Sequence, residues 1–223
     1  MEVRKKIAVF SDFDGTISEK DVCYLLLEKY ADFNWQEIDK KWIDGELSTE
    51  EAYRTMLGKI DLKKSEFDRF IDNVKIDESF VIFYEFCRSN SIEIEIVSDG
   101  LDYYIKRILG KYGITDISIH TNHLEFDGET WVLQFNNTAA KLCPKKNNPC
   151  GFCKIEPVLK KKNDGFITVY IGDGASDRCP ATVSDYLFAK GYLANYCRDN
   201  NIIHREFKSF EDIKNTLKEI LYE

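Results

Sequence analysis

From about residue 80 onward, the chain alternates short apolar segments with longer segments in which apolar residues recur every three or four positions. The first pattern is typical of buried β-strands and the second of amphipathic α-helices. Strands that alternate with helices form a mostly parallel sheet with helices on both faces. The sequence therefore predicts an α/β fold with a doubly wound, Rossmann-like, mostly parallel sheet. The predicted strands are residues 7–10, 92–97, 116–121, 166–171 and 186–189, with helices near 80–87, 101–109 and 209–221 and a hairpin that turns at Asp127-Gly128.

Residues 20–76 differ from the rest of the chain, because their apolar residues follow only helical spacing and no strand pattern occurs. The block comes directly after the first predicted strand. We therefore expect a small helical cap inserted into an α/β domain. The expected division is a core of residues 1–19 and 77–223 and a cap of residues 20–76.

Two capping patterns predict where helices of the cap begin. Ser18 is followed three residues later by Asp21, and Ser48 by Glu51, which is the spacing of a capping box. Three aromatic residues of the same block are expected to form the interior of the cap rather than a wall of a substrate site: Trp35, Trp42 and Tyr53.

Composition argues against nucleic acid and membranes as partners. Lys and Arg number 31 against 39 Asp and Glu, and proteins that bind bulk nucleic acid or anionic membranes are normally basic. No window approaches the roughly 18 consecutive apolar residues that cross a bilayer. The basic start of the chain precedes an apolar run too short for a secretory signal, and seven cysteines do not suit a disulfide framework. We expect a cytoplasmic protein with reduced thiols.

Acidic and hydroxyl side chains follow three of the predicted strands. Asp12 and Asp14 follow the first strand, Ser98 the second, and Asp173 and Asp177 the strand at 166–171. In doubly wound sheets ligands bind at the carboxyl ends of the strands, so these side chains should meet there. Clustered carboxylates repel one another unless a cation offsets their charge, and hard oxygen ligands suit Mg²⁺. One Asp-x-Asp-Gly alone could be an ordinary turn, but a second acidic cluster after a later strand favours a magnesium-dependent phosphoryl site.

Four motifs resemble those of the haloacid dehalogenase superfamily of phosphatases. They occur in the right order and cover nearly the whole chain, and the helical block is similar to the cap of the phosphoserine-phosphatase-like branch. Three longer stretches resemble the phosphatases of 2-hydroxy-3-keto-5-methylthiopentenyl-1-phosphate, from methionine salvage, and their relatives. The motifs are Asp12-Phe13-Asp14-Gly15-Thr16, Ser98, Lys154 and Gly172-Asp173-Gly174-Ala175-Ser176-Asp177, and the stretches are residues 97–105, 150–154 and 171–178.

The resemblance implies a catalytic role for four residues. Asp12 would attack phosphorus and form an aspartyl-phosphate, which divides one difficult displacement into two easier ones. Asp14 would protonate the leaving alcohol and then deprotonate the attacking water. Ser98 would donate a hydrogen bond to a phosphate oxygen, and Lys154 would neutralise charge on the nucleophile and on the transferring group.

The resemblance also implies Mg²⁺ as the cofactor and a small phosphorylated metabolite as the substrate. The expected metal ligands are Asp12, the Asp14 carbonyl and Asp173, and Ser176 and Asp177 would support them. Substrate or phosphate contacts are expected from Thr16, Asp99, Gly100 and Asp21.

Asp21 leaves the substrate open. The methylthiopentenyl phosphate is favoured, but phosphoserine phosphatases carry a glutamate at this offset from the nucleophile, where it meets the substrate ammonium. In this chain the side chain is one methylene shorter, and it is equally a candidate helix cap. Transfer of the phosphoryl group to an acceptor alcohol is a third alternative.

Three cysteines, Cys143, Cys150 and Cys153, lie close in sequence and downstream of His120 and His123. They allow a structural metal site, a redox pair or thiols that pack within a loop, and we favour packing because a second C-x-x-C is missing. The remaining cysteines are predicted to lie in the core: Cys23, Cys87, Cys179 and Cys197.

Overall fold

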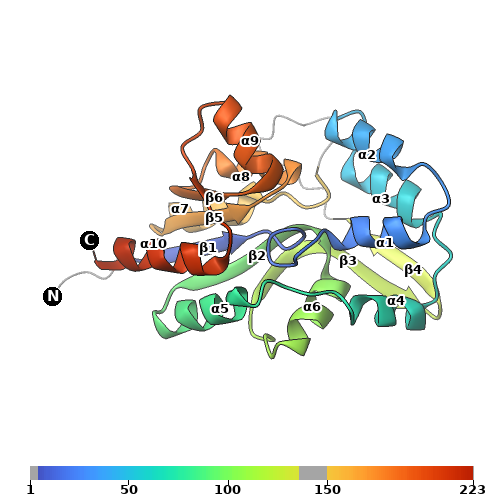
Figure 1. Ribbon diagram of the computed structural model, residues 1–223, viewed down its shortest axis with the longest axis horizontal. Coiled ribbons are helices and arrows are strands. Elements are labelled where there is room, and N and C mark those ends of the chain that lie inside the picture. The colour runs from blue at the N-terminus through green and yellow to red at the C-terminus, as the bar shows by residue number, and fades with distance from the viewer. Residues whose placement is uncertain (1–4, 136–149, 223) are drawn as a thin grey trace.

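The computed structural model describes residues 5–135 and 150–222, which include a seven-stranded sheet with β1 at its centre (Figure 1). The strand order is β4-β3-β2-β1-β5-β6-β7. Neighbouring strands are parallel except β3 and β4, which form an antiparallel hairpin. The predicted α/β, mostly parallel fold is confirmed. The strands are β1 (Ile7–Ser11), β2 (Glu93–Leu101), β3 (Ser118–Asp127), β4 (Thr130–Gln134), β5 (Ile167–Gly172), β6 (Tyr186–Ala189) and β7 (Arg205–Glu206).

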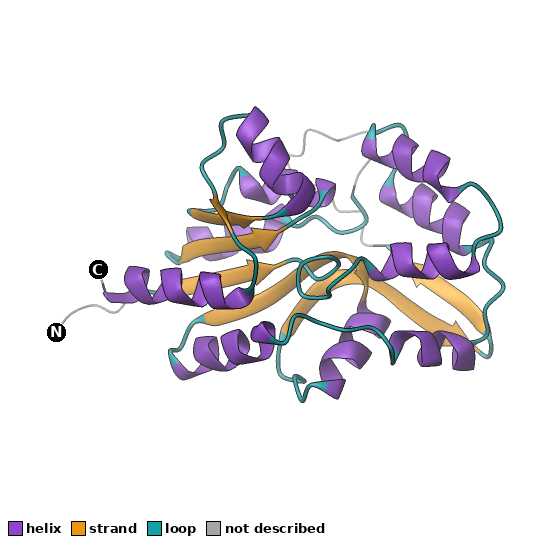
Figure 2. Cartoon of the chain, viewed as in Figure 1, coloured by secondary structure: helices purple, strands orange, loops and turns teal. Residues whose placement is uncertain are grey.

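Consecutive residues of β1 show how both faces of the sheet are covered. Ile7 and Val9 belong to one buried apolar cluster, and Ala8 and Phe10 to another, because successive side chains of a strand point to opposite faces. Figure 2 shows helices in layers above and below the strands. The first cluster includes side chains of α5 (Ser79–Ser89), α6 (Asp102–Lys111) and α10 (Phe210–Tyr222), and the second those of α7 (Ile155–Asn163), α8 (Arg178–Ala181) and α9 (Gly191–Asp199).

Four helices lie between β1 and α5: α1 (Val22–Tyr30), α2 (Trp35–Ile43), α3 (Thr49–Leu57) and α4 (Lys64–Ile71). A bridge between Ser18 and Ile76 joins the two ends of this segment. In Figure 1, α1, α2 and α3 lie on one side of the β3–β4 hairpin and α4 on the other. Phe67 of α4 packs against Trp131 of β4, with 4.7 Å between the ring centroids. No helix in the two described ranges is long and apolar enough to cross a membrane.

Two strands are longer than the sequence predicts. β2 continues past Val97 to Leu101, and its register against β3 shifts between these two residues, so Ser98 lies within the strand rather than after it. β3 runs without interruption from Ser118 to Asp127, which joins the predicted strand at 116–121 to the first arm of the hairpin. The irregular register explains the first difference, because a bulge breaks the alternation on which a strand prediction depends.

One of the two predicted capping patterns is wrong. Asp21, rather than Ser18, caps α1, since its carboxylate accepts a hydrogen bond from Tyr24 N at 2.8 Å. The Ser18 hydroxyl instead donates to Phe13 O at 3.0 Å or Lys20 O at 2.8 Å. The second pattern is confirmed, because Ser48 and Glu51 form a reciprocal capping box at the start of α3.

Candidate active site

The carboxyl ends of β1, β2 and β5 border a cavity of about 560 Å³, whose other walls come from α1, α2 and α3. A chain that crosses from strand to strand through helices returns each strand end to the same edge of the sheet. The structure thereby brings the three predicted polar clusters together. The predicted site residues that line the cavity are Asp12, Asp14, Asp21, Ser98, Asp99, Gly100, Lys154, Asp173 and Ser176.

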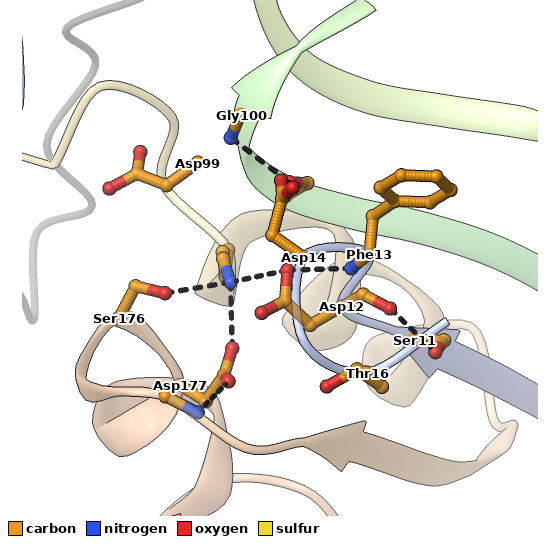
Figure 3. Close-up of polar contacts among 12 residues, drawn as sticks. Ser11, Asp12, Phe13, Asp14, Thr16, Asp99, Gly100, Ser176 and Asp177 are labelled. Carbon is orange, nitrogen blue, oxygen red and sulfur yellow. Dashed lines mark hydrogen bonds and ion pairs between the residues drawn. The ribbon is translucent and has the colours of Figure 1, made fainter. Parts of the chain in front are cut away.

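A buried ammonium group connects the ends of β1 and β5. Lys154 Nζ lies 2.9 Å from Asp12 Oδ1 and 2.7 Å from Asp177 Oδ1, and it donates to Ser176 Oγ at 2.8 Å. Figure 3 shows Asp12, Ser176 and Asp177 pointing toward this shared centre. Burial alone would lower the pKa of Lys154, but the two carboxylates more than offset that effect and hold the pKa above its ordinary value. Lys154 is therefore a fixed positive charge at the floor of the cavity.

Asp12 has one carboxylate oxygen held in place and one without a partner. Oδ1 accepts a hydrogen bond from Phe13 N at 2.8 Å and contacts Lys154, whereas no donor to Oδ2 occurs among the residues that the structure describes. Burial raises the pKa of Asp12 well above its ordinary value, with a further increase from Asp177 and an opposing effect of Lys154. An oriented carboxylate with one open oxygen at a cavity wall can act as a nucleophile.

Asp12, Asp173 and Asp177 have carboxylate oxygens within 4.8 Å of one another. Asp173 Oδ1 accepts a hydrogen bond from the Thr16 hydroxyl at 2.7 Å, and the described residues provide no donor to Asp173 Oδ2. Burial, and then repulsion from Asp177, raise the pKa of Asp173 to about 6. Gly15 adopts a φ of +72° in this crowded turn, and a Cβ there would lie 2.5 Å from Asp173 Oδ2. The open oxygen of Asp173, the nearby Asp12 carboxylate and an excess of negative charge fit a divalent cation with hard ligands such as Mg²⁺.

Asp177 differs from the other two carboxylates, because both of its oxygens already have donors. Oδ1 accepts from the Tyr170 hydroxyl at 2.6 Å and from Lys154, and Oδ2 accepts from the backbone N–H groups of Asp173 and Gly174 at 3.1 and 3.0 Å. The residue is fully buried. Asp177 is therefore suited to orient Lys154 and the Asp173 backbone rather than to bind a cation directly.

Asp14 points away from Asp12 and toward Gly100 (Figure 3). Its Oδ2 accepts from the Tyr104 hydroxyl at 2.5 Å and lies 3.4 Å from Ser98 Oγ, and its Oδ1 accepts from Val22 N at 3.0 Å. Burial raises the pKa of Asp14, and the hydrogen bond from Tyr104 opposes that shift. A carboxyl group with a raised pKa can carry a proton nearer to neutral pH, as a general acid requires.

Two residues predicted to contact the substrate, Thr16 and Asp99, have protein partners in the structure. Thr16 donates to Asp173, and its side chain is buried. Asp99 lines the cavity, but its Oδ1 accepts from Phe152 N and its Oδ2 from the Thr49 hydroxyl, each at 2.9 Å. Asp99 therefore links the start of α3 to the segment that carries Lys154.

The lining contributed by α1, α2, α3 and the loop before α1 combines apolar and acidic side chains. Trp42 and Tyr53, which we expected in the cap interior, are partly buried and also line the cavity. Asp21 lines it too, while its carboxylate caps α1. The apolar and aromatic lining is Cys23, Tyr24, Leu25, Trp42, Ile43, Ala52, Tyr53 and Met56, and the acidic lining is Glu19, Asp21, Glu28 and Asp39.

Sequence reasoning missed three polar residues of the site. Lys190 follows β6, and its Nζ donates to Thr16 O at 3.3 Å. Lys190 directly follows the predicted strand at 186–189, so the rule that ligands bind at the carboxyl ends of strands would have identified it. Tyr170 gave no comparable signal, because it lies within β5. Tyr104 lies in the stretch 97–105 that carries the resemblance, but it is on α6 rather than in a loop after a strand, and no role was predicted for it.

The cysteine cluster is only partly described. Cys143 lies outside the described residues, and Cys153 is buried beside Ile155. His120 Nε2 pairs with Glu95 Oε2 at 2.7 Å. In residues 5–135 and 150–222, no group of three potential metal ligands includes a cysteine. Of the cysteines predicted in the core, Cys23, Cys87 and Cys197 are buried, whereas Cys179 is only partly buried.

The chain is similar to known phosphatases over nearly its whole length. A family described as Putative Phosphatase matches residues 7–220. Two relatives are named 2-hydroxy-3-keto-5-methylthiopentenyl-1-phosphate phosphatase. The one from Exiguobacterium sibiricum is 32% identical over 215 residues, which cover 95% of this chain and 96% of the relative, and the one from Brevibacillus brevis is 28% identical over 221 residues, 98% of each.

Solved structures of phosphoserine phosphatase share the fold. A phospho-aspartyl intermediate analogue has a TM-score of 0.72 at 20% identity, and a substrate-bound complex has a TM-score of 0.69 at 18% identity. Each alignment covers 96% of this chain and 99% of the other.

Proposed function

Since this chain belongs to the Putative Phosphatase family and is a phosphatase of the haloacid dehalogenase superfamily, we propose that it hydrolyses a small phosphorylated metabolite through an aspartyl-phosphate on Asp12. The observation that carries the proposal is the state of the Asp12 carboxylate. Its Oδ1 is fixed by Phe13 N and by Lys154, both within 2.9 Å, and its Oδ2 has no donor among the described residues. One oxygen is thus held while the other is available for bond formation.

The reaction follows from the neighbours of Asp12. Asp12 Oδ2 attacks phosphorus while Asp14 gives its proton to the oxygen of the leaving alcohol, so that the P–O bond breaks and the Asp12 ester forms. Asp14 then takes a proton from water, which attacks phosphorus and releases inorganic phosphate and free Asp12. Lys154 offsets negative charge on the transferring group in both steps, and the Ser98 hydroxyl is near enough to Asp14 to donate to a phosphate oxygen beside it.

The proposed cofactor is Mg²⁺. The Asp12 carboxylate, the open oxygen of Asp173 and the Asp14 carbonyl would hold the ion, with Asp177 and Ser176 supporting Lys154 and the loop around Asp173. When bound, Mg²⁺ supplies positive charge to a phosphate oxygen and reduces the repulsion between the anionic substrate and the site.

We assign residues 20–76 to a cap and residues 1–19 and 77–223 to the core. Helices α1, α2 and α3 supply the walls of the cavity that face the sheet, which supports a role of this segment in substrate selection. Packing of α4 against the β3–β4 hairpin ties the end of the same segment to the core.

The favoured substrate is 2-hydroxy-3-keto-5-methylthiopentenyl-1-phosphate or a closely similar sugar phosphate. Relatives that align over 95% or more of this chain carry that name. The apolar lining by Leu25, Ile43 and Met56 suits an uncharged methylthio tail, whose burial is favourable. Phosphoserine is the second candidate, because the Asp21 carboxylate lines the cavity where a substrate ammonium could reach it.

A panel of phosphorylated metabolites assayed for phosphate release, with Mg²⁺ and with EDTA, tests the proposal. We expect turnover only with Mg²⁺, and none for Asp12→Asn in a protein that remains folded. Asp116→Asn, at an exposed position that does not line the cavity, is the matched control and should retain full activity. Substantial turnover by Asp12→Asn would exclude the aspartyl-phosphate. Addition of an acceptor alcohol separates hydrolysis from phosphoryl transfer, because only transfer yields a new phosphate ester.

A further inference from the structure

The closest side-chain hydrogen bond to Asp14 comes from a residue outside the four family motifs. Tyr104 lies on α6, and its hydroxyl is 2.5 Å from Asp14 Oδ2. Ser98 approaches the same oxygen at 3.4 Å, and Val22 N donates to Oδ1 at 3.0 Å. The Asp14 carboxylate is thus held by a core helix on one oxygen and by the first turn of α1 on the other.

The surroundings of Tyr104 fix the position of its hydroxyl. The residue is 2% exposed, and its ring packs against Phe13, with 6.1 Å between the centroids. Gly100 leaves room for the contact, because a Cβ at that position would lie 1.9 Å from the Tyr104 hydroxyl and 2.5 Å from Asp14 Oδ2. A phenol hydroxyl is protonated at neutral pH, so Tyr104 is the donor in this hydrogen bond.

We propose that Tyr104 is a positioning residue for the acid–base step, which holds Asp14 Oδ2 so that Asp14 Oδ1 carries and releases the proton. The inference rests on the proposed phosphatase mechanism. Oδ2 accepts the Tyr104 hydrogen bond, so a proton on the Asp14 carboxyl belongs on Oδ1. The Val22 N–H does not conflict with this, because a carboxyl hydroxyl oxygen can still accept a hydrogen bond.

The hydrogen bond contributes most when Asp14 is charged. As the P–O bond to the leaving group breaks, the Oδ1 proton moves to the alcohol oxygen and Asp14 becomes a carboxylate. Tyr104 keeps its own proton throughout and stabilises that carboxylate, since a hydrogen bond to an ionised group is stronger than one to a neutral group. Tyr104 thereby favours the transition state over the ground state.

Tyr104→Phe tests this role by removing only the hydroxyl. The assay compares kcat/KM for the alkyl phosphate that the wild type hydrolyses best with kcat/KM for p-nitrophenyl phosphate, whose leaving group needs little protonation. We expect a loss of roughly 10- to 100-fold with the alkyl phosphate, the size of a hydrogen bond to a charged group, and less than about 3-fold with the aryl phosphate. Asp14→Asn should show the same selectivity, with a larger loss.

The chain offers a matched control one residue away. The Tyr103 hydroxyl donates to Asp68 at 2.6 Å, outside the cavity lining, so Tyr103→Phe should leave both rates unchanged. Gly100→Ala is a second variant, which keeps the hydroxyl but crowds both it and Asp14 Oδ2 at their contact, and it should show the same preference for the aryl phosphate. The control for this variant is Gly110→Ala. Gly110 lies on α6, the helix that carries Tyr104, and no atom lies within 4 Å of an added Cβ there.

Three results would overturn the inference. Equal losses on both substrates in Tyr104→Phe would indicate a merely structural contact, and unchanged rates would indicate no role in the step. These two results test the role of Tyr104 once Asp12→Asn has been shown to be inactive. If Asp12→Asn retains turnover, the aspartyl-phosphate mechanism is wrong, and the inference about Tyr104, which rests on that mechanism, is wrong as well.

Discussion

Replacing Asp173 with Asn is expected to stabilise the metal-free protein at neutral pH, although Asp173 is a proposed Mg²⁺ ligand. Burial and the nearby Asp177 carboxylate raise the pKa of Asp173 from an ordinary value of 3.8 to about 6. At about 1.4 kcal/mol per pKa unit, the ionised Asp173 destabilises the folded state by up to about 3 kcal/mol at pH 7.5. Asparagine removes the charge, and its side-chain oxygen can still accept the hydrogen bond from Thr16.

The pH dependence has a definite sign. Between pH 3.8 and about 6 the folded chain holds a proton on Asp173 that the unfolded chain has released. This group therefore adds stability to the wild type as the pH falls through about 6 toward 4, and Asp173→Asn lacks that contribution. The difference in the free energy of unfolding between the two proteins should be largest above about pH 6 and should vanish below about pH 4.

Urea unfolding in EDTA at pH 7.5 and at pH 5 measures this difference. We expect up to about 3 kcal/mol at pH 7.5, or a rise in Tm of roughly 6–12 °C for a chain of this size, and a smaller difference at pH 5. Added Mg²⁺ should raise the Tm of the wild type and have little effect on Asp173→Asn, because a cation stabilises only the state that binds it.

Asp185→Asn is the control of opposite sign. Burial alone would raise the pKa of Asp185, but hydrogen bonds from Lys162 and Thr168 more than offset it and hold the pKa below its ordinary value. Its ionised form therefore stabilises the fold, and the substitution should lower the Tm at pH 7.5. An Asp173→Asn protein that is less stable than the wild type in EDTA at pH 7.5, or whose stability changes with pH as the wild type does, would refute the electrostatic reasoning.

Three further substitutions have defined outcomes. Lys154→Met should abolish turnover and lower the free energy of unfolding by about 3–5 kcal/mol at pH 7.5, because it leaves Asp12 and Asp177 buried without their cation. The control Lys160→Met, at an exposed position on α7, should change neither turnover nor stability. Thr49→Val removes the hydrogen bond between α3 and Asp99 and should raise KM with a loss of about 1–3 kcal/mol in urea unfolding, whereas Thr55→Val, whose hydroxyl bonds only within α3, should leave KM unchanged. Asp21→Asn keeps a good helix cap, and it should leave turnover of the methylthiopentenyl phosphate unchanged but raise KM for phosphoserine; an equal rise for both substrates would contradict an ammonium contact.

Much of the site could be read from residues adjacent in sequence. Asp12 and Asp14 follow a strand whose uninterrupted apolar run marks it as central, and Asp173 and Asp177 follow another of the same kind. Parallel strands with helical crossovers return their ends to one edge, so a local pattern was sufficient to predict that these carboxylates meet. The fold class and the lining of the phosphoryl end of the cavity depend on that same argument.

The partners of each carboxylate were decided only by the tertiary structure. Tyr104 meets Asp14 across 90 positions of sequence, and Thr49 meets Asp99 across 50. Such pairs depend on how helices pack on the sheet, and neither periodicity nor spacing records that packing. The register shift around Ser98 was likewise decided only by the tertiary structure, since it depends on the pairing of β2 with β3. The sequence determined which strand ends carry the chemistry, because alternation and turn residues are local properties, while the packing of α1, α3 and α6 against those ends decided which oxygen of each carboxylate is held and which is left open.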